Sequence, residues 1–322
     1  MKSSPISMES TQTMPPASAA RQGKSVASVV KPRSYRPKAR SYTYRLRLRI
    51  LAAVVYVLAA VILTFLSVAT VWGQSLDTVM MESVMRWSAH LGGAHRVVTH
   101  MVTHPVIVCV AIFVSVVALL RRRVTLAGRA LVMVAGANIS TQILKMLVER
   151  PHLGVTTETV NSLPSGHVTV AVSLCIALIM VAPEWLRGPS AWLGWVWTCA
   201  MGVSVMLSAW HRLADVLVAV LLTGAWALLL TPLESRKRHG VLMQKVMWLL
   251  VCVCLVLALF SLVFAVWNVD IVGAAQPGSG FGFADFLSVQ PMRANLLALS
   301  ALLWMVAVVG SVIYSVDRLA GE

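Results

Sequence analysis

The stretch that decides the fold is LPSGHVTVAVSLCIALIMVA, residues 163–182. It opens on a proline, a serine and a glycine, and it then continues in apolar residues with few interruptions. Ser165 is of a type that caps helices, and Gly166 lets the backbone approach a bound group closely. The stretch predicts an apolar helix that begins near His167, with a turn directly before it.

Apolar runs of this kind recur along all 322 residues. The chain is 58% hydrophobic and only 12% charged, with a mean hydropathy of +0.79, which excludes a soluble globular domain. Runs of about 18 or more apolar residues can cross a ~30 Å hydrocarbon core, and there they must be helical because lipid offers the backbone no partners. We therefore expect an all-α integral membrane protein with spans near 50–72, 102–120, 126–147, 167–182, 191–210, 213–232, 244–267 and 294–316.

The net charge of +15 is concentrated at the N-terminus, where residues 1–49 hold eleven Lys/Arg and one acid, Glu9. Residues 1–45 are also rich in Ser and Pro and are predicted to be a disordered basic cytoplasmic tail. No aromatic-interleaved pattern accompanies the basic residues, so the expected partners of the tail are anionic inner-leaflet lipids and not nucleic acid. We expect residues 46–235 to form a six-helix membrane core and residues 236–322 to add two transmembrane helices.

The placement of Lys and Arg predicts the orientation in the cell membrane. With the tail inside, the internal segments collect Arg121-Arg122-Arg123 and Arg236-Lys237-Arg238, whereas the external segments hold few basic residues. A multi-pass topology of eight spans with both termini cytoplasmic satisfies this rule. It brings Lys145, His167 and His211, which are far apart in sequence, to the same extracytoplasmic face.

Two neighbouring groups of residues are suited to binding an anion. Lys145 ends one apolar run, and Arg150 follows it with a planar set of donors that matches phosphate oxygens. Ser165 and Gly166 place free backbone N–H groups at a helix N-terminus, where the helix dipole also favours negative charge. A lysine that reaches the membrane surface and an ordinary capped helix are the structural alternatives.

A third group combines a histidine with a carboxylate. His211 and Asp215 are four residues apart, so on a helix Asp215 can hold one imidazole nitrogen and leave the other free. A histidine oriented in this way can act as a nucleophile, and His167 could give a proton to a leaving oxygen. The alternative is a purely structural His–Asp hydrogen bond.

The other histidines carry a weaker signal. His95, His100 and His104 lie close together, and the spacing of the last two is compatible with zinc binding. No carboxylate or cysteine ligand is found nearby in the sequence, so we expect no metal site there.

Two further outer segments are less informative. Residues 73–101 mix polar and apolar positions, as an interfacial helix would. Residues 276–283 contain three glycines, but no strand precedes them. A flexible linker is therefore expected there in preference to a phosphate cradle.

Taken in order, the three groups resemble the motifs of the type 2 phosphatidic acid phosphatase (PAP2) superfamily, over roughly residues 138–220. The middle motif, Pro164-Ser165-Gly166-His167, matches fully. The first motif is Lys-x6-Arg-Pro in that family, whereas here four residues separate Lys145 from Arg150-Pro151. The third is Ser-Arg-x5-His-x3-Asp, and here Val205 replaces its arginine.

The resemblance implies a metal-independent membrane phosphatase, without a cofactor, that hydrolyses a lipid phosphate or diphosphate at the extracytoplasmic leaflet through a phosphohistidine. It implies that His211 attacks phosphorus, that Asp215 orients it and that His167 protonates the leaving group. The implied ligands of the phosphate oxygens are Lys145, Arg150, Ser165 and Gly166, with Arg212 a candidate for the charge that is missing at position 205. Two alternatives remain open: a non-catalytic PAP2-like protein that binds or moves lipid phosphates, and a transporter or channel unrelated to phosphate.

Overall fold

The computed structural model describes residues 39–91, 124–157, 161–231 and 241–320, together with Ile112 and Val116. Over these residues the chain is helical and contains no strand. Its elements are α1 (Ala39–Ala69), α2 (Val71–Met85), the 3₁₀ helix η1 (Arg86–Leu91), α5 (Val124–Leu147), α6 (Gly166–Val181), α7 (Glu184–Leu207), α8 (Leu213–Leu230), α9 (Val241–Val266), α10 (Ala284–Val289) and α11 (Pro291–Ala320).

Six of the described helices are long and apolar enough to cross a membrane, namely α1, α5, α7, α8, α9 and α11. A seventh apolar helix, α6, is shorter, with 16 residues. These helices correspond to seven of the eight expected spans. The remaining one, near 102–120, lies outside the described residues except for Ile112 and Val116. The expected class, an all-α multi-pass membrane protein, is confirmed.

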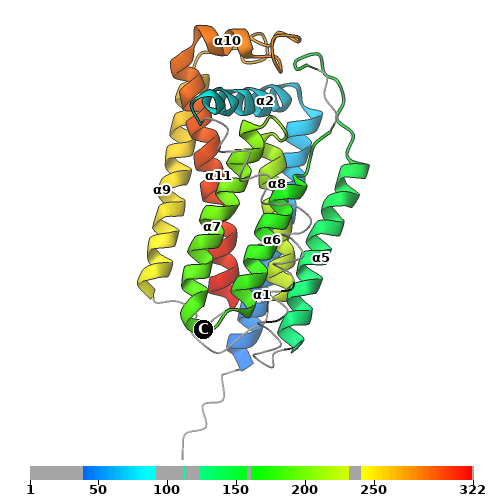
Figure 1. Ribbon diagram of the computed structural model, residues 1–322, viewed down its shortest axis with the longest axis vertical. Helices are drawn as coiled ribbons and strands as arrows, with labels where there is room; N and C mark the ends of the chain where they lie inside the picture. Colours follow the sequence, from blue (N-terminus) through cyan, green and yellow to red (C-terminus); the bar gives the residue numbers. More distant parts are fainter. Residues whose placement is uncertain are drawn as a thin grey trace, which may run out of the picture. The chain divides into compact units, whose positions relative to one another are not determined.

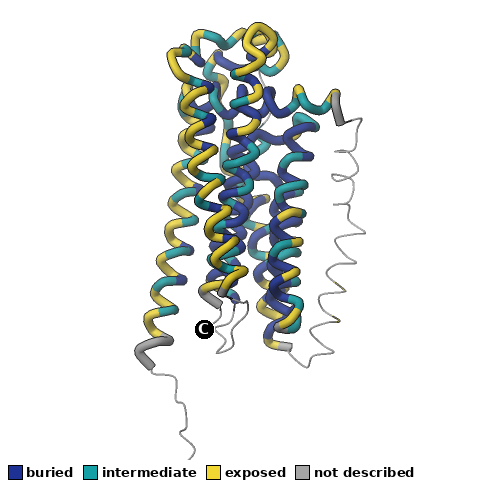
Figure 2. Tube along the Cα trace, turned by 90° about the vertical axis from the view of Figure 1, so that its left-hand side faces the viewer, coloured by how far each residue is buried: buried dark blue, intermediate teal, exposed yellow. Residues whose placement is uncertain are grey.

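The outer faces of the helices are apolar. Phe65 on α1 is 62% exposed and Phe264 on α9 is 54% exposed, and they are two of many large apolar side chains on these helices that no other part of the bundle covers. Figure 2 shows buried residues where the helices face one another and exposed residues along the outer faces. Water-soluble proteins rarely expose apolar surface on this scale, so these faces are suited to lipid.

The long helices run side by side, and α2 lies across one end of them (Figure 1). The C-terminal helix α11 packs along α9 and also contacts α8, α7 and α2. The short helix α10 lies at the same end as α2 (Figure 1). This end of the bundle therefore combines residues from the beginning, the middle and the end of the chain.

Helix α7 differs at both ends from the expected span 191–210. The helix begins earlier, at Glu184, and tolerates Pro189 in its second turn. It ends at Leu207 because Ala209 adopts a left-handed conformation (φ 59°). The N–H groups of Ala209 and Trp210 donate to the carbonyls of Met206 and Val205, both at 3.0 Å, which is the Schellman pattern of helix termination. This turn places His211 directly before α8.

Candidate active site

Asp215, in the first turn of α8, is the centre of the candidate site. Its side chain is fully buried, and its Oδ2 lies 3.3 Å from Nδ1 of His211. The same oxygen accepts the backbone N–H of Arg212 at 3.0 Å and a short hydrogen bond from the Ser162 hydroxyl. The expected contact between His211 and Asp215, four residues apart, is therefore present, although His211 lies just before α8 and not on it. It engages Nδ1 of His211, so Nε2 is the nitrogen left for chemistry.

The turn that ends α7 holds the backbone of His211. Its N–H donates to the carbonyl of Val205 at 3.3 Å, beside the bond from Trp210 to the same oxygen. The Val205 side chain is completely buried within the main hydrophobic cluster. The residue that stands in place of the motif's arginine thus contributes to packing, and its carbonyl helps to position His211.

The helix start at Ser165 packs against the start of α8. The Ser165 hydroxyl accepts the Val168 N–H at 3.4 Å, so Ser165 is the N-cap of α6 as its sequence predicts. The Ser165 N–H donates to the backbone carbonyl of Asp215 at 3.0 Å. This contact brings His167 to the site, with its ring centroid 6.5 Å from that of His211 and 5.4 Å from that of Trp210.

Arg150 lies on the other side of Asp215. Its Nη2 is 3.7 Å from Asp215 Oδ1, and its Nη1 donates to the Ser67 carbonyl at 3.4 Å. The side chain is only 4% exposed, yet Nε and Nη2 make no hydrogen bond. A buried guanidinium with unused donors beside a histidine can bind an anion with little reorganisation.

Polar side chains of α5 are directed at α6. The Asn138 amide donates to the Ser173 hydroxyl at 3.3 Å, and a Cβ added to Gly166 would lie 3.8 Å from the Gln142 amide nitrogen. Lys145 lies in the last turn of α5, close enough for its positive charge to act on His167. Among the predicted site residues, Lys145, Arg150, His167 and His211 therefore converge at one end of the bundle, around Asp215.

The structure adds Asp77 and Thr78 of α2, which the sequence analysis did not single out. Asp77 Oδ1 accepts the Ala214 N–H at 2.9 Å and so caps α8, while Thr78 Oγ1 accepts Nε of Arg212 at 3.0 Å. Burial, reinforced by the nearby charge of Asp215, raises the pKa of Asp77 to about 6. An acidic residue in a segment that mixes polar and apolar positions was the available signal.

Burial and the neighbouring charge of Arg150 lower the pKa of Arg212 from its usual value. Arg212 also borders a small cavity of about 120 Å³ beside His211. The described residues that line this cavity come from α2, from the segments before α6 and α8, and from the loop before α10: Met81, Ser162, Ala209, Trp210, His211, Arg212 and Phe281.

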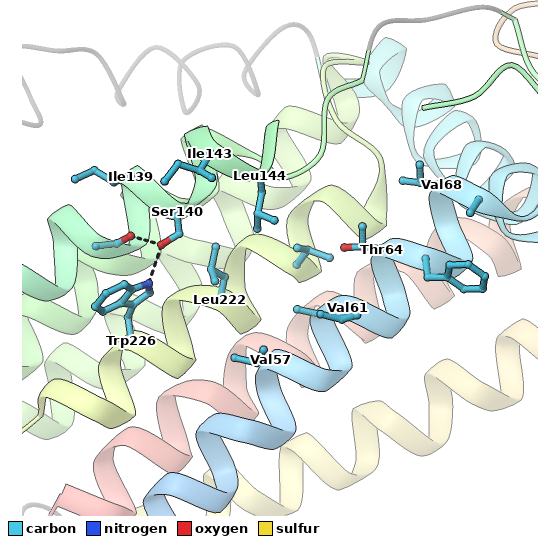
Figure 3. A pocket seen from close by; sticks show the side chains of 15 residues that line it. Val57, Val61, Thr64, Val68, Ile139, Ser140, Ile143, Leu144, Leu222 and Trp226 are labelled. Carbon is cyan, nitrogen blue, oxygen red and sulfur yellow. Dashed lines mark hydrogen bonds between the residues drawn. The ribbon is translucent and has the colours of Figure 1, made fainter. Parts of the chain in front are cut away.

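A larger apolar groove of about 800 Å³ lies between α1, α5 and α8. Figure 3 shows Val57, Val61 and Val68 of α1 on one side of it, and Ile139 and Ile143 of α5 on the other. Its polar groups are few, and the Ser140 hydroxyl is already engaged by the Trp226 indole at 2.8 Å. Val68 adjoins Ser67, whose carbonyl binds Arg150, so the groove reaches the neighbourhood of the candidate site.

Together the fold and the site define a multi-pass helical membrane protein with a buried cluster of histidines, arginines and carboxylates at one end. Residues 126–239 match the family model described as the PAP2 superfamily. The family resemblance is therefore confirmed over this part of the chain. The matched region includes Arg150, His167 and His211 but neither Asp77 nor Phe281. Searches of the curated proteins and of the solved structures found no match.

The histidines His95, His100 and His104 lie outside the described residues, so the absence of a metal site among them stays a prediction. Residues 1–38 of the expected tail, which was predicted over residues 1–45, lie outside them as well, so the cytoplasmic location of the tail stays a prediction.

Proposed function

We propose that this protein is a membrane phosphatase that hydrolyses a lipid phosphate or diphosphate through a phosphohistidine. The observation that carries the proposal is the pairing of His211 with Asp215, with His167 facing it at 6.5 Å between ring centroids and Arg150 beside it. A phosphoryl group placed between the two rings would contact a nucleophile, a proton donor and a cation.

In the first half of the reaction, Nε2 of His211 attacks phosphorus while the bond from phosphorus to the leaving oxygen breaks. His167, protonated at the start, gives its proton to that oxygen. Asp215 stabilises the positive charge that His211 acquires. Arg150 and Arg212 neutralise the negative charge on the phosphoryl oxygens. Lys145, Ser165 and the Gly166 N–H are the further proposed ligands of those oxygens.

In the second half, His167 accepts a proton from water as the water oxygen attacks phosphorus. The bond from phosphorus to His211 breaks, and inorganic phosphate leaves with both histidines restored to their starting states. No residue changes its oxidation state.

The apolar groove of Figure 3 supports an amphiphilic substrate, because an acyl or prenyl chain could lie in it while the phosphate enters the site. Under the positive-inside rule, the basic internal segments support cytoplasmic termini and an extracytoplasmic site. In this arrangement the basic tail binds anionic lipids of the inner leaflet.

The test is phosphate release from purified protein supplied with long-chain lipid phosphates, a lipid diphosphate and a short-chain phosphate. We expect metal-independent turnover of the long-chain substrates, inhibition by orthovanadate and loss of turnover in His211→Ala. Full activity in His211→Ala would end the mechanism.

The replacement of the third-motif arginine by Val205 favours one alternative, a non-catalytic protein that binds lipid phosphates. It predicts that the unaltered chain binds vanadate or lipid phosphate without releasing inorganic phosphate. Binding without turnover across the substrate panel would support this alternative against the phosphatase.

A further inference from the structure

The end of α1 presents backbone carbonyls that its own helix cannot satisfy, because the last four C=O groups of an α-helix have no intrahelical partner. Side chains from outside α1 bind two of them. The Ser67 carbonyl accepts Nη1 of Arg150 at 3.4 Å. The neighbouring Val68 carbonyl accepts Nε2 of Gln74 at 2.7 Å. Since the negative end of the helix dipole also favours a cation, the end of α1 is suited to hold Arg150.

Gln74 also binds the backbone directly after Arg150. Its Nε2 donates a second hydrogen bond, at 2.9 Å, to the carbonyl of Pro151, 77 positions away in sequence. Both partners of this amide are carbonyl oxygens, so only its NH2 group can face them. Gln74 is 1% exposed, and little water can compete for these bonds. The two N–H groups therefore join the end of α1 to the segment that carries Arg150.

The corner between α1 and α2 places Gln74 at this point. The Thr70 hydroxyl accepts the Gly73 N–H at 3.0 Å and donates to the Leu66 carbonyl at 2.6 Å, so it caps α2 and binds the last turn of α1. A Cβ on Gly73 would lie 1.9 Å from the Leu66 carbonyl oxygen. Only glycine allows the two helices to approach so closely. The corner thus fixes where the next residue, Gln74, projects.

Arg150 depends on this link because its own contacts are long. It lies beyond the end of α5, in a stretch without helix. Among the described residues, its guanidinium lies 3.4 Å from the Ser67 carbonyl and 3.7 Å from Asp215 Oδ1. Both distances exceed the usual length of a hydrogen bond. The shorter bond from Gln74 to Pro151 holds the adjacent backbone, and this backbone decides where the Arg150 side chain starts.

The same side of α2 also contacts the start of α8. Asp77 follows Gln74 by three residues, so the two side chains lie on one face of the helix. Asp77 Oδ1 accepts the Ala214 N–H at 2.9 Å, directly before Asp215. One face of α2 therefore holds the backbone beside Arg150 and the backbone beside Asp215, and it fixes these two segments relative to each other.

We propose that Gln74 is a positioning residue for phosphoryl binding: it holds Arg150 beside Asp215, where the guanidinium can bind the oxygens of a phosphoryl group on His211. This inference rests on the proposed function. The Nε and Nη2 groups of Arg150 make no hydrogen bond, and they can bind oxygens with little reorganisation only while the side chain stays in place. Gln74 lies outside the matched residues 126–239, so this role belongs to a part of the chain that the family model does not cover.

The experiment measures the binding of orthovanadate to the purified full chain from the shift that it causes in the melting temperature. Gln74→Met keeps the approximate size of the side chain and removes both N–H donors. We expect it to weaken vanadate binding by about 10-fold, as for residues of one hydrogen-bond network, and to lower kcat/KM for a lipid phosphate by a similar factor. The matched control is Gln244→Met in the first turn of α9, which removes a glutamine hydrogen bond of 3.0 Å to Asp317 and should leave vanadate affinity unchanged.

A double-mutant cycle separates positioning from a general structural effect. If Gln74 acts through Arg150, Gln74→Met causes no further loss of vanadate affinity in a protein that already carries Arg150→Ala. A purely structural role would cost the same factor in both backgrounds. Should Arg150→Ala abolish vanadate binding, Arg150→Lys takes its place, and the loss caused by Gln74→Met should then be smaller than in the unaltered background.

Unchanged vanadate affinity in a folded Gln74→Met protein, or an equal loss in both backgrounds, would overturn the inference and leave the proposed function standing. If the unaltered protein binds vanadate without releasing phosphate from any substrate, the proposed function fails, and the binding cycle still decides the inference. If it neither binds vanadate nor releases phosphate, both fail. If Gln74→Met does not fold, Gln74→Asn decides the same comparisons, because it keeps the amide but shortens the side chain by one methylene.

Discussion

Replacing Asp215 by asparagine tests the arrangement of the site most directly. The change keeps the size of a side chain that is fully buried and removes its charge. The hydrogen bond to Nδ1 of His211 is charge-assisted, and such bonds contribute about 1.5–3 kcal/mol. Since 1.36 kcal/mol is tenfold in rate, losing it reduces turnover by roughly 10- to 150-fold. An asparagine that donates to Nδ1 would also place the imidazole proton on Nε2, and the total loss then reaches about 10⁴-fold.

We therefore expect kcat for phosphate release from a lipid phosphate to fall by roughly 10 to 10⁴ in Asp215→Asn, with a much smaller change in KM. The control is Ser162→Ala, which removes a different hydrogen bond to the same carboxylate oxygen and leaves His211 oriented. It should cost less than about 10-fold. The melting temperature shows whether each variant is folded. A folded Asp215→Asn protein with kcat within threefold of the unaltered chain would refute the reasoning.

Two further predictions concern stability. Ala209→Gly should stabilise the protein by about 1 kcal/mol, because Ala209 holds a left-handed conformation that disfavours a Cβ; an unchanged or lower melting temperature would contradict this. For Asp77, whose pKa is raised to about 6, the folded protein holds a proton that the unfolded chain releases near pH 4. Stability is therefore lost as pH rises from about 4 to about 6, by an amount on the order of 3 kcal/mol. Asp77→Asn lacks this titration, so the melting temperature of the variant minus that of the unaltered protein should increase from about pH 4 to about pH 6. A difference that stays constant over this interval would contradict the raised pKa of Asp77.

The structure also clarifies the departure in the third motif. Val205 is part of the hydrophobic core, while Arg212 borders the cavity beside His211. The position directly after His211 therefore places a cation beside this cavity. The Schellman turn allows His211 and Arg212 to lie beside the same cavity, because it ends α7 only a few residues before α8 begins.

The sequence by itself determined the class of the fold and much of the site. Its apolar runs are local signals, since each helix must satisfy its own backbone in lipid, and so α5, α8, α9 and α11 were expected close to where they are found. The first span was expected to begin near residue 50, whereas α1 begins at Ala39. The His211–Asp215 contact and the Ser165 cap were predictable because the residues that they join are only four and three positions apart in sequence.

Only the tertiary structure decided what surrounds that local core. Glu82 and Phe283 are 201 positions apart in sequence, and Asp77 and Ala214 are 137 apart. No periodicity or spacing relates such residues, because their contact depends on how α2 crosses the bundle end and on where α9 and α11 return the chain. The loop 276–283, expected to be a flexible linker, is held against α2 because its backbone N–H groups donate to the buried carboxylate of Glu82, and such a partner is visible only once the chain is folded.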